Sequence, residues 1–250
     1  MEGFKAAFIN EIEKMYKKKK AVVVIIISLV VIVLSQLIVI GVRNGFGIRG
    51  VSSLEFPITV LTVFVNTILP LFTALVAIDV FTGEFSQNTM KIALTRPVTR
   101  IKLFSAKIAA TAFFVLANLF IVMILSTLTG FIFNTASITA TGFIRILVAY
   151  VVTLIPILTL ILVVVMLANL FRSGSATFFL CIILFIAFKV LGYVFSQYSS
   201  LFITSMLDWY NLWIADSIPI LKILRMFLIM AGYGIMSFTA GFYFFDKKDL

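Results

Sequence analysis

The residues with the most scope for specific chemistry lie in one charged segment of the sequence, Asp79 to Lys107, between two long apolar runs. Phe81, Phe85 and Ile92 recur there at helical spacing, so they share one face of a helix. A purely solvated linker would not need such a stripe. An apolar stripe among charged side chains suits binding to a soluble protein, and the segment is therefore predicted to be a docking element. Its basic side chains are Lys91, Arg96, Arg100, Lys102 and Lys107.

Pro97 divides this segment, because proline has no amide hydrogen and fits the first turn of a helix but not its interior. A short helix is predicted from Ser86 to Thr95, with Ser86 as its N-cap. A second helix is predicted to begin near Pro97. It should carry basic residues to a bilayer surface, where they meet anionic lipid. These residues are Arg100, Lys102 and Lys107.

Catalytic chemistry is disfavoured by what the sequence lacks. It contains no histidine, which removes His-dependent metal sites and Ser-His-Asp triads. It has no G-x-x-x-x-G-K-[ST] motif, and therefore no P-loop for ATP. Its single cysteine, Cys181, lies in an apolar run and excludes an internal disulfide. We predict no catalytic residue, no metal site and no cofactor bound by this chain.

The composition indicates an integral membrane protein. Of the 250 residues, 62% are hydrophobic and 12% are charged, with a mean hydropathy of +1.20. Soluble proteins average roughly 45 to 50% apolar and 25% charged residues. A net charge of +10 would favour a nucleic-acid partner in a soluble protein. Here the basic residues flank apolar runs, so membrane lipid accounts for them and no nucleic acid is predicted.

The predicted fold is all-α, with an N-terminal helix that lies on the membrane. Residues 1–20 form this amphipathic interfacial helix, because Phe4, Phe8, Ile12 and Met15 fall on one face. A disordered basic leader is the alternative, and the regular spacing of the four apolar residues disfavours it.

Residues 21–250 are predicted to form a transmembrane domain of six helices. The first apolar run has 22 residues, enough to cross a ~30 Å hydrocarbon core at ~1.5 Å per residue. Residues 196–225 are too apolar for a free loop and too charged to cross, so short re-entrant helices are predicted there on the external side. The predicted spans are about 21–42, 57–78, 108–131, 146–171, 176–195 and 226–245, with a coupling loop at 79–107.

Basic residues predict the orientation of these spans. With the spans placed as above, 14 basic residues fall on one side and 5 on the other. The side richer in lysine and arginine is cytoplasmic. Both termini and the docking segment are therefore predicted to face the cytoplasm.

Four residues within the spans are candidates for lining a path or a subunit interface: Gln36, Asn66, Pro70 and Lys189. Gln36 is interpreted chiefly as a helix–helix hydrogen bond. Asn66 and Pro70 are one turn apart, which predicts a kink next to a buried amide, and packing is favoured over path lining. Lys189 lies near the outer end of its span, so snorkelling is favoured; a cation for an acidic cargo or a partner carboxylate is the alternative.

The docking segment also contains a recognisable order of residues, from an acidic residue through an apolar pair and a proline to a closing lysine. It resembles the first cytoplasmic loop of the ABC-2 type permeases, which are the membrane subunits of one class of ATP-driven exporters. That family usually has glycine before the threonine, where this chain has Asn88, and asparagine also tolerates tight turns. The matching residues are Glu84, Asn88, Thr89, Ala93, Leu94, Arg96, Pro97, Arg100 and Lys107.

The resemblance implies a fold like that of type V exporters, with a coupling helix that fits a separate cytoplasmic ABC ATPase. Two ATPase copies are expected, with ATP and Mg²⁺ bound on the ATPase. The permease is expected to pair with a second copy of itself or with a sister permease. The residues expected to couple this chain to the ATPase are Phe81, Glu84, Phe85, Asn88, Thr89, Leu94, Arg96, Pro97 and Arg100.

The predicted function is that of a permease subunit that forms the path for an exported cargo, either amphipathic or hydrophobic, such as a peptide, a drug or a lipid-like molecule. A proton-coupled or ion-coupled carrier is disfavoured, because no acidic residue lies deep in a predicted span. Two alternatives stay open: a structural or assembly subunit without its own path, and an ion-extruding ABC permease. The expected location is the cell membrane, as a bacterial plasma-membrane protein.

Overall fold

The computed structural model describes residues 2–17, 19–46, 51–83, 99–134, 139–171 and 173–247, and every element in these ranges is a helix. The elements are α1 (Glu2–Lys17), α2 (Lys19–Phe46), α3 (Glu55–Asn66), α4 (Ile68–Phe81), α7 (Arg100–Phe133), α8 (Ala140–Val152), α9 (Leu154–Leu170), α10 (Gly174–Val194), η1 (Ser196–Leu201), α11 (Ile203–Met206), η2 (Leu207–Leu212) and α12 (Ile220–Asp246).

The expectation of an all-α membrane protein is confirmed. Five of the described helical stretches are long and apolar enough to cross a membrane, and the bent pair α3–α4 can supply a sixth span. Several helices run beyond the predicted spans: α7 begins at Arg100, the fourth span begins at Ala140, and α12 begins at Ile220. Charged residues at a span end do not stop a helix, so the apolar window marks only part of it.

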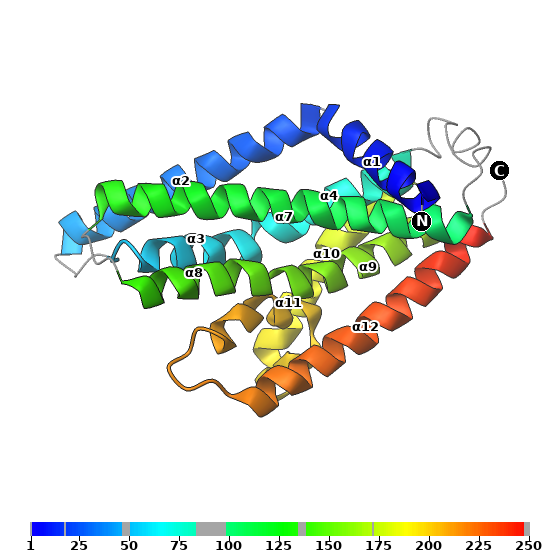
Figure 1. Cartoon of the computed structure of the whole chain (residues 1–250). Helices are drawn as coiled ribbons and strands as arrows, with labels where there is room; N and C mark the ends of the chain where they lie inside the picture. The colour runs from blue at the N-terminus through cyan, green and yellow to red at the C-terminus, as the bar shows by residue number, and fades with distance from the viewer. Residues whose placement is uncertain are drawn as a thin grey trace.

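The helices form an elongated bundle with two distinct ends (Figure 1). The start of α1, the end of α4, the start of α7 and the end of α12 lie together at one end, called here the docking end. The end of α2 and the starts of α3 and α8 lie at the far end. The end of α4 and the start of α7 therefore lie at the same end of the bundle as the start of α1 and the end of α12.

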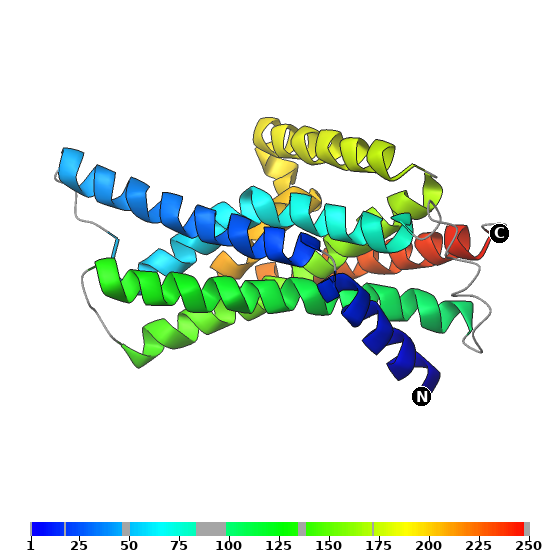
Figure 2. The ribbon, with the colours of Figure 1, turned by 90° about the horizontal axis from the view of Figure 1, so that it is seen from above.

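Helix α10 lies to one side of the bundle (Figure 2). Only 11% of its most apolar stretch is buried, against 44% in the α8–α9 span. Ser173 caps its first turn, because its side chain accepts a hydrogen bond from the amide of Ala176 at 3.4 Å. The buried centre of the bundle is instead α9, which packs against α4, α7 and α12.

The second span is broken between α3 and α4, where the chain bends by 50°. Pro70 explains the break: it has no amide hydrogen, and its ring clashes with the carbonyl of Asn66 four residues earlier. Helix α3 accordingly ends at Asn66, and α4 resumes at Ile68. The predicted kink is thus present as two separate helices.

Helices α3 and α7 approach closely at the far end of the bundle. A Cβ added to Gly130 on α7 would lie 2.7 Å from the backbone oxygen of Ser53, just before α3. Glycine is therefore the residue that permits this approach. The buried face of α3, formed by Phe56, Val60 and Phe64, recurs every four residues as expected for an amphipathic helix.

Candidate functional site

The structure describes two of the nine predicted coupling residues, Phe81 and Arg100. Phe81 is the last residue of α4, and Arg100 is the first residue of α7. They therefore mark, within the docking segment, where α4 ends and α7 begins. The other predicted coupling residues lie outside the described residues and stay predictions: Glu84, Phe85, Asn88, Thr89, Leu94, Arg96 and Pro97.

Phe81 belongs to a cluster of five phenylalanines that joins three helices at the docking end. Phe104 on α7 is fully buried, and its ring centroid lies 5.5 Å from that of Phe81 and 5.3 Å from that of Phe245 on α12. Edge-to-face aromatic pairs stabilise by about 0.5–1.5 kcal/mol beyond their burial. The phenylalanine cluster thus ties the ends of α4 and α12 to the start of α7. Its members are Phe81, Phe104, Phe238, Phe242 and Phe245.

Arg100 contacts the end of α12. Its guanidinium donates a hydrogen bond to the backbone carbonyl of Asp246 and lies 3.6 Å from the Asp246 carboxylate. Both side chains are about half exposed, and ion pairs of that kind contribute at most about 1 kcal/mol. A cation at a helix C-terminus also meets the negative end of the helix dipole. The contact mainly aligns α7 with α12.

Lys107 is buried within the protein, so the prediction that its side chain meets anionic lipid is wrong. Its side chain is 1% exposed, and its Nζ lies 3.2 Å from Glu11 Oε2 on α1. The same Nζ donates to the carbonyl oxygen of Val80 at 3.1 Å. Lys107 is two helical turns after Arg100, on the side of α7 that faces α1 and α4, so it points into the protein.

The buried face of α1 also differs from the predicted stripe. Ala7, Glu11 and Met15 are buried, whereas Phe4 is exposed. Phe8 still contacts α7, at 6.1 Å between its ring centroid and that of Phe113. The ion pair with Lys107 places Glu11 on the buried face of α1. Part of the predicted apolar stripe, including Phe4, is therefore exposed.

A second polar group lies at the α3–α4 break and is called here the break cluster: Thr62, Asn66, Lys189, Asp208 and Tyr210. Lys189 on α10 donates a hydrogen bond to the Asn66 side-chain oxygen. The Asn66 amide nitrogen donates to Asp208 Oδ1 at 2.7 Å and to the Thr62 carbonyl at 3.0 Å. One amide therefore lies between a lysine and a carboxylate from two other elements.

Tyr210 completes the break cluster. Its hydroxyl shares a hydrogen bond of 2.7 Å with the Thr62 hydroxyl. Burial raises the pKa of the Tyr210 phenol, and the nearby Asp208 carboxylate raises it further. Tyr210 therefore stays neutral at physiological pH and can still donate a proton to a hydrogen bond.

Lys189 was interpreted from the sequence either as a snorkelling side chain or as a cation for an acidic cargo or a partner carboxylate. Its Nζ contacts Asn66 and lies 6.0 Å from the Phe185 ring centroid. Asp208, reached through Asn66, is the nearby carboxylate that the sequence did not identify. Its only sequence signal was an acidic residue within an apolar, tryptophan-containing stretch.

Replacing Lys189 with methionine is expected to destabilise the protein by about 1–3 kcal/mol, because Asn66 loses its donor and Asp208 loses the nearby cation. Thermal unfolding of the purified protein in detergent measures this. The double variant Lys189→Met with Asp208→Asn should recover most of the loss, since it removes both charges. Losses that simply add in the double variant would contradict the link through Asn66, and the exposed Lys222→Met is the matched control.

Gln36 forms a reciprocal amide pair with Asn134 at the end of α7. Gln36 Nε2 donates to Asn134 Oδ1 at 3.2 Å, and Asn134 Nδ2 donates to Gln36 Oε1 at 3.4 Å. This is the helix–helix contact favoured from the sequence, here between α2 and α7.

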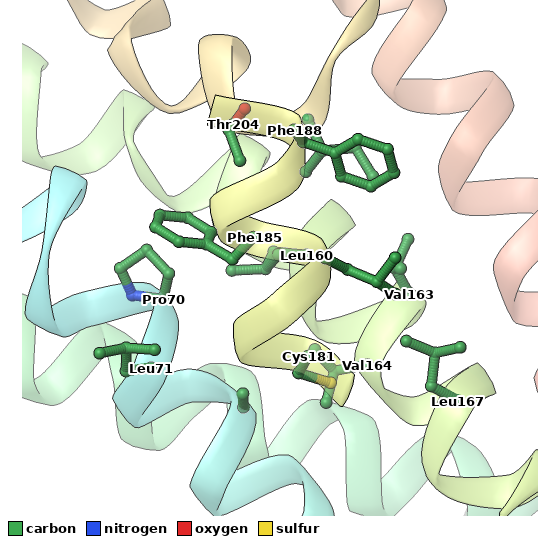
Figure 3. Close-up of a pocket in the computed structure, with 13 residues that line it drawn as sticks. Pro70, Leu71, Leu160, Val163, Val164, Leu167, Cys181, Phe185, Phe188 and Thr204 are labelled. Carbon is green, nitrogen blue, oxygen red and sulfur yellow. The ribbon is translucent and has the colours of Figure 1, made fainter. Parts of the chain in front are cut away.

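An apolar groove runs between α4, α9 and α10, and Pro70 lies on its wall (Figure 3). Its cavity volume is about 50 Å³, whereas sites for drug-sized ligands enclose roughly 300–1,000 Å³. The hydroxyl of Thr204 points away from the centre of the groove (Figure 3). The groove within one chain is therefore too small for a drug-sized cargo.

Metal chemistry has no support in the described part of the chain. Among residues 2–17, 19–46, 51–83, 99–134, 139–171 and 173–247, no three histidine, cysteine, aspartate or glutamate side chains are grouped so that they could hold a metal ion. The two polar sites are built from ion pairs and amides, which suits holding and moving helices.

Comparison with known proteins covers part of each site. Residues 7–189 match the model of a family described as ABC-2 family transporter protein. The match includes α1 from Ala7, the docking segment and α10 as far as Lys189, and it ends before Asp208, Tyr210 and α12. None of the curated proteins compared with the chain matches it.

Proposed function

We propose, on the premise that the chain belongs to the ABC-2 transporter family, that it is the permease subunit of an exporter driven by a separate cytoplasmic ATPase. Residues 82–99 bind the ATPase, and the two ATPase copies hold ATP and Mg²⁺. The docking end then faces the cytoplasm, together with both termini, in a bacterial plasma membrane. The chain itself is a multi-pass membrane component.

The observation that carries this proposal is the frame around the docking segment. Residues 82–99 follow Phe81 at the end of α4 and precede Arg100 at the start of α7, and both Phe81 and Arg100 contact α12. A displacement of these residues is therefore transmitted to α4, α7 and α12 together, through buried aromatic rings. A flexible loop between helices that do not contact each other would not transmit the same displacement.

The cargo path is proposed to lie between two permease subunits. The groove described above is too small for a large cargo, and many apolar side chains of α2, α10 and α12 are exposed on the single chain. A second copy or a sister permease would enclose more space than one chain can. The apolar surroundings favour an amphipathic or hydrophobic cargo over a small ion.

Purification from the native membrane after crosslinking tests this function. The chain should bring with it a cytoplasmic ATPase, and the reconstituted complex should hydrolyse ATP and export a cargo from proteoliposomes. The chain purified alone should hydrolyse no ATP. A complex that exports equally well after the chain is removed would instead support a structural or assembly subunit.

A further inference from the structure

Lys107 occupies the point at which three helices meet. Its Nζ contacts Glu11 of α1 at 3.2 Å and the Val80 carbonyl of α4 at 3.1 Å, and it lies 5.9 Å from the centroid of the Phe81 ring. The Lys107 and Glu11 side chains are 1% and 4% exposed. This ion pair is therefore shielded from water, whereas the Lys17 and Glu13 side chains that pair on α1 are 78% and 60% exposed.

The hydrogen bond from Lys107 to the Val80 carbonyl lies at the C-terminal end of α4. The last four carbonyls of a helix have no amide partner within that helix, and Val80 is the penultimate residue of α4. The Lys107 ammonium donates to this carbonyl and also meets the negative end of the helix dipole. Lys107 thus caps the end of α4, just before residues 82–99.

Glu11 explains how a lysine can be buried at that point. An ammonium group taken out of water without a counter-charge is very unfavourable, and the Glu11 carboxylate supplies that charge from α1. The second Glu11 oxygen accepts a hydrogen bond from Lys14 at 2.8 Å. If α1 moved away alone, a buried charge would be left behind, so α1 is expected to move with α4 and α7.

We propose that Glu11 and Lys107 are positioning residues for ATP-driven transport, which fix α1 to the end of α4 so that both follow the docking segment. This inference rests on the proposed function. The role of Glu11 and Lys107 is to make the N-terminal helix part of the moving unit, rather than an independent anchor on the membrane.

The test uses the complex of the full chain with its copurified ATPase in proteoliposomes. A fluorophore is attached to α1 at Ile9→Cys in a Cys181→Ser background, because Ile9 is 45% exposed. The measurement is the change in emission on adding ATP and Mg²⁺, divided by the rate of ATP hydrolysis. This ratio needs no knowledge of the cargo.

The informative variant exchanges the two charges, Glu11→Lys with Lys107→Glu. It can still form a buried ion pair, but a carboxylate cannot donate to the Val80 carbonyl. We expect the emission change per ATP hydrolysed to fall about fivefold or more, the low end of typical coupling effects. The matched control is Glu13→Gln on the same helix, in an exposed ion pair with Lys17, and it should leave the ratio unchanged.

The outcomes separate the two proposals. If the exchange variant, folded as judged by its melting temperature, keeps the ratio of the control, the inference is overturned and the pair is structural only. If the exchange variant does not fold, the neutral pair Glu11→Gln with Lys107→Met takes its place, with the same expected loss. A wild-type complex that binds no ATPase or gives no ATP response would overturn the proposed function, and this inference with it.

Discussion

Two glycines inserted after Met90 should abolish ATP-driven export while leaving membrane insertion unchanged. Met90 lies in the docking segment, outside the described residues, and the sequence predicts a short helix there. Each glycine disfavours a helix by about 1 kcal/mol relative to alanine. The added length also makes the segment more flexible, so that it transmits less of the ATPase movement. Glu84→Lys should have a similar effect, because it reverses the charge expected to face the ATPase. Export from proteoliposomes and ATP hydrolysis are measured side by side.

The control for the insertion places two glycines after Ser217, in the exposed turn before α12, next to Asp216, which forms an ion pair with Arg145 near the start of α8. Export should survive there. The competing explanation is that the segment only anchors the chain by its positive charge. Under that explanation the insertion and Glu84→Lys would both be tolerated, whereas neutralising Arg100 and Lys102 together would stop export. Lys107 does not belong in this comparison, because it is buried.

Phe104→Ala is expected to lower the free energy of unfolding by about 3–5 kcal/mol, the usual range for removing a buried phenylalanine. Phe104 is fully buried, and its ring lies within 6 Å of those of Phe81, Phe238, Phe242 and Phe245, so a cavity would open between three helices. Thermal unfolding in detergent measures the change.

The control for Phe104 is Phe133→Ala at the far end of the same helix, where the side chain is 55% exposed. Exposed substitutions usually change stability by about 0.5 kcal/mol or less. Equal shifts for the two variants would contradict the central role of Phe104 in the phenylalanine cluster.

The spans could be predicted from the sequence because hydrocarbon thickness dictates their length and composition. The ends of the spans were less exact, since a helix continues through charged turns: the third span was predicted from residue 108, whereas α7 begins at Arg100, close to the helix start that Pro97 predicts. The break near Pro70 was predictable because it depends on residues four positions apart. Local chemistry of that kind is visible in a sequence.

The contacts that define the two sites were not predictable, because they join residues far apart in the chain. Lys107 and Glu11 are 96 positions apart, and Asn66 and Asp208 are 142 apart. A single sequence shows a lysine near a span end but not the carboxylate that permits its burial. The phenylalanine cluster was missed for the same reason, since Phe104 and Phe245 meet only after α7 and α12 have packed.

The length of α7 affects how a movement at the docking end reaches the far end of the bundle. It runs unbroken for 34 residues, which at ~1.5 Å per residue is a rod of roughly 50 Å. Arg100 and Lys107 contact neighbouring helices at one end of the rod. At the other end, Gly130 packs against the start of α3 and Asn134 hydrogen-bonds to Gln36 of α2. A tilt of about 5° about the docking end moves the far end by roughly 4 Å. The helix can therefore act as a lever arm, which turns a small rotation on one side of the membrane into a displacement of about an atom's diameter on the other.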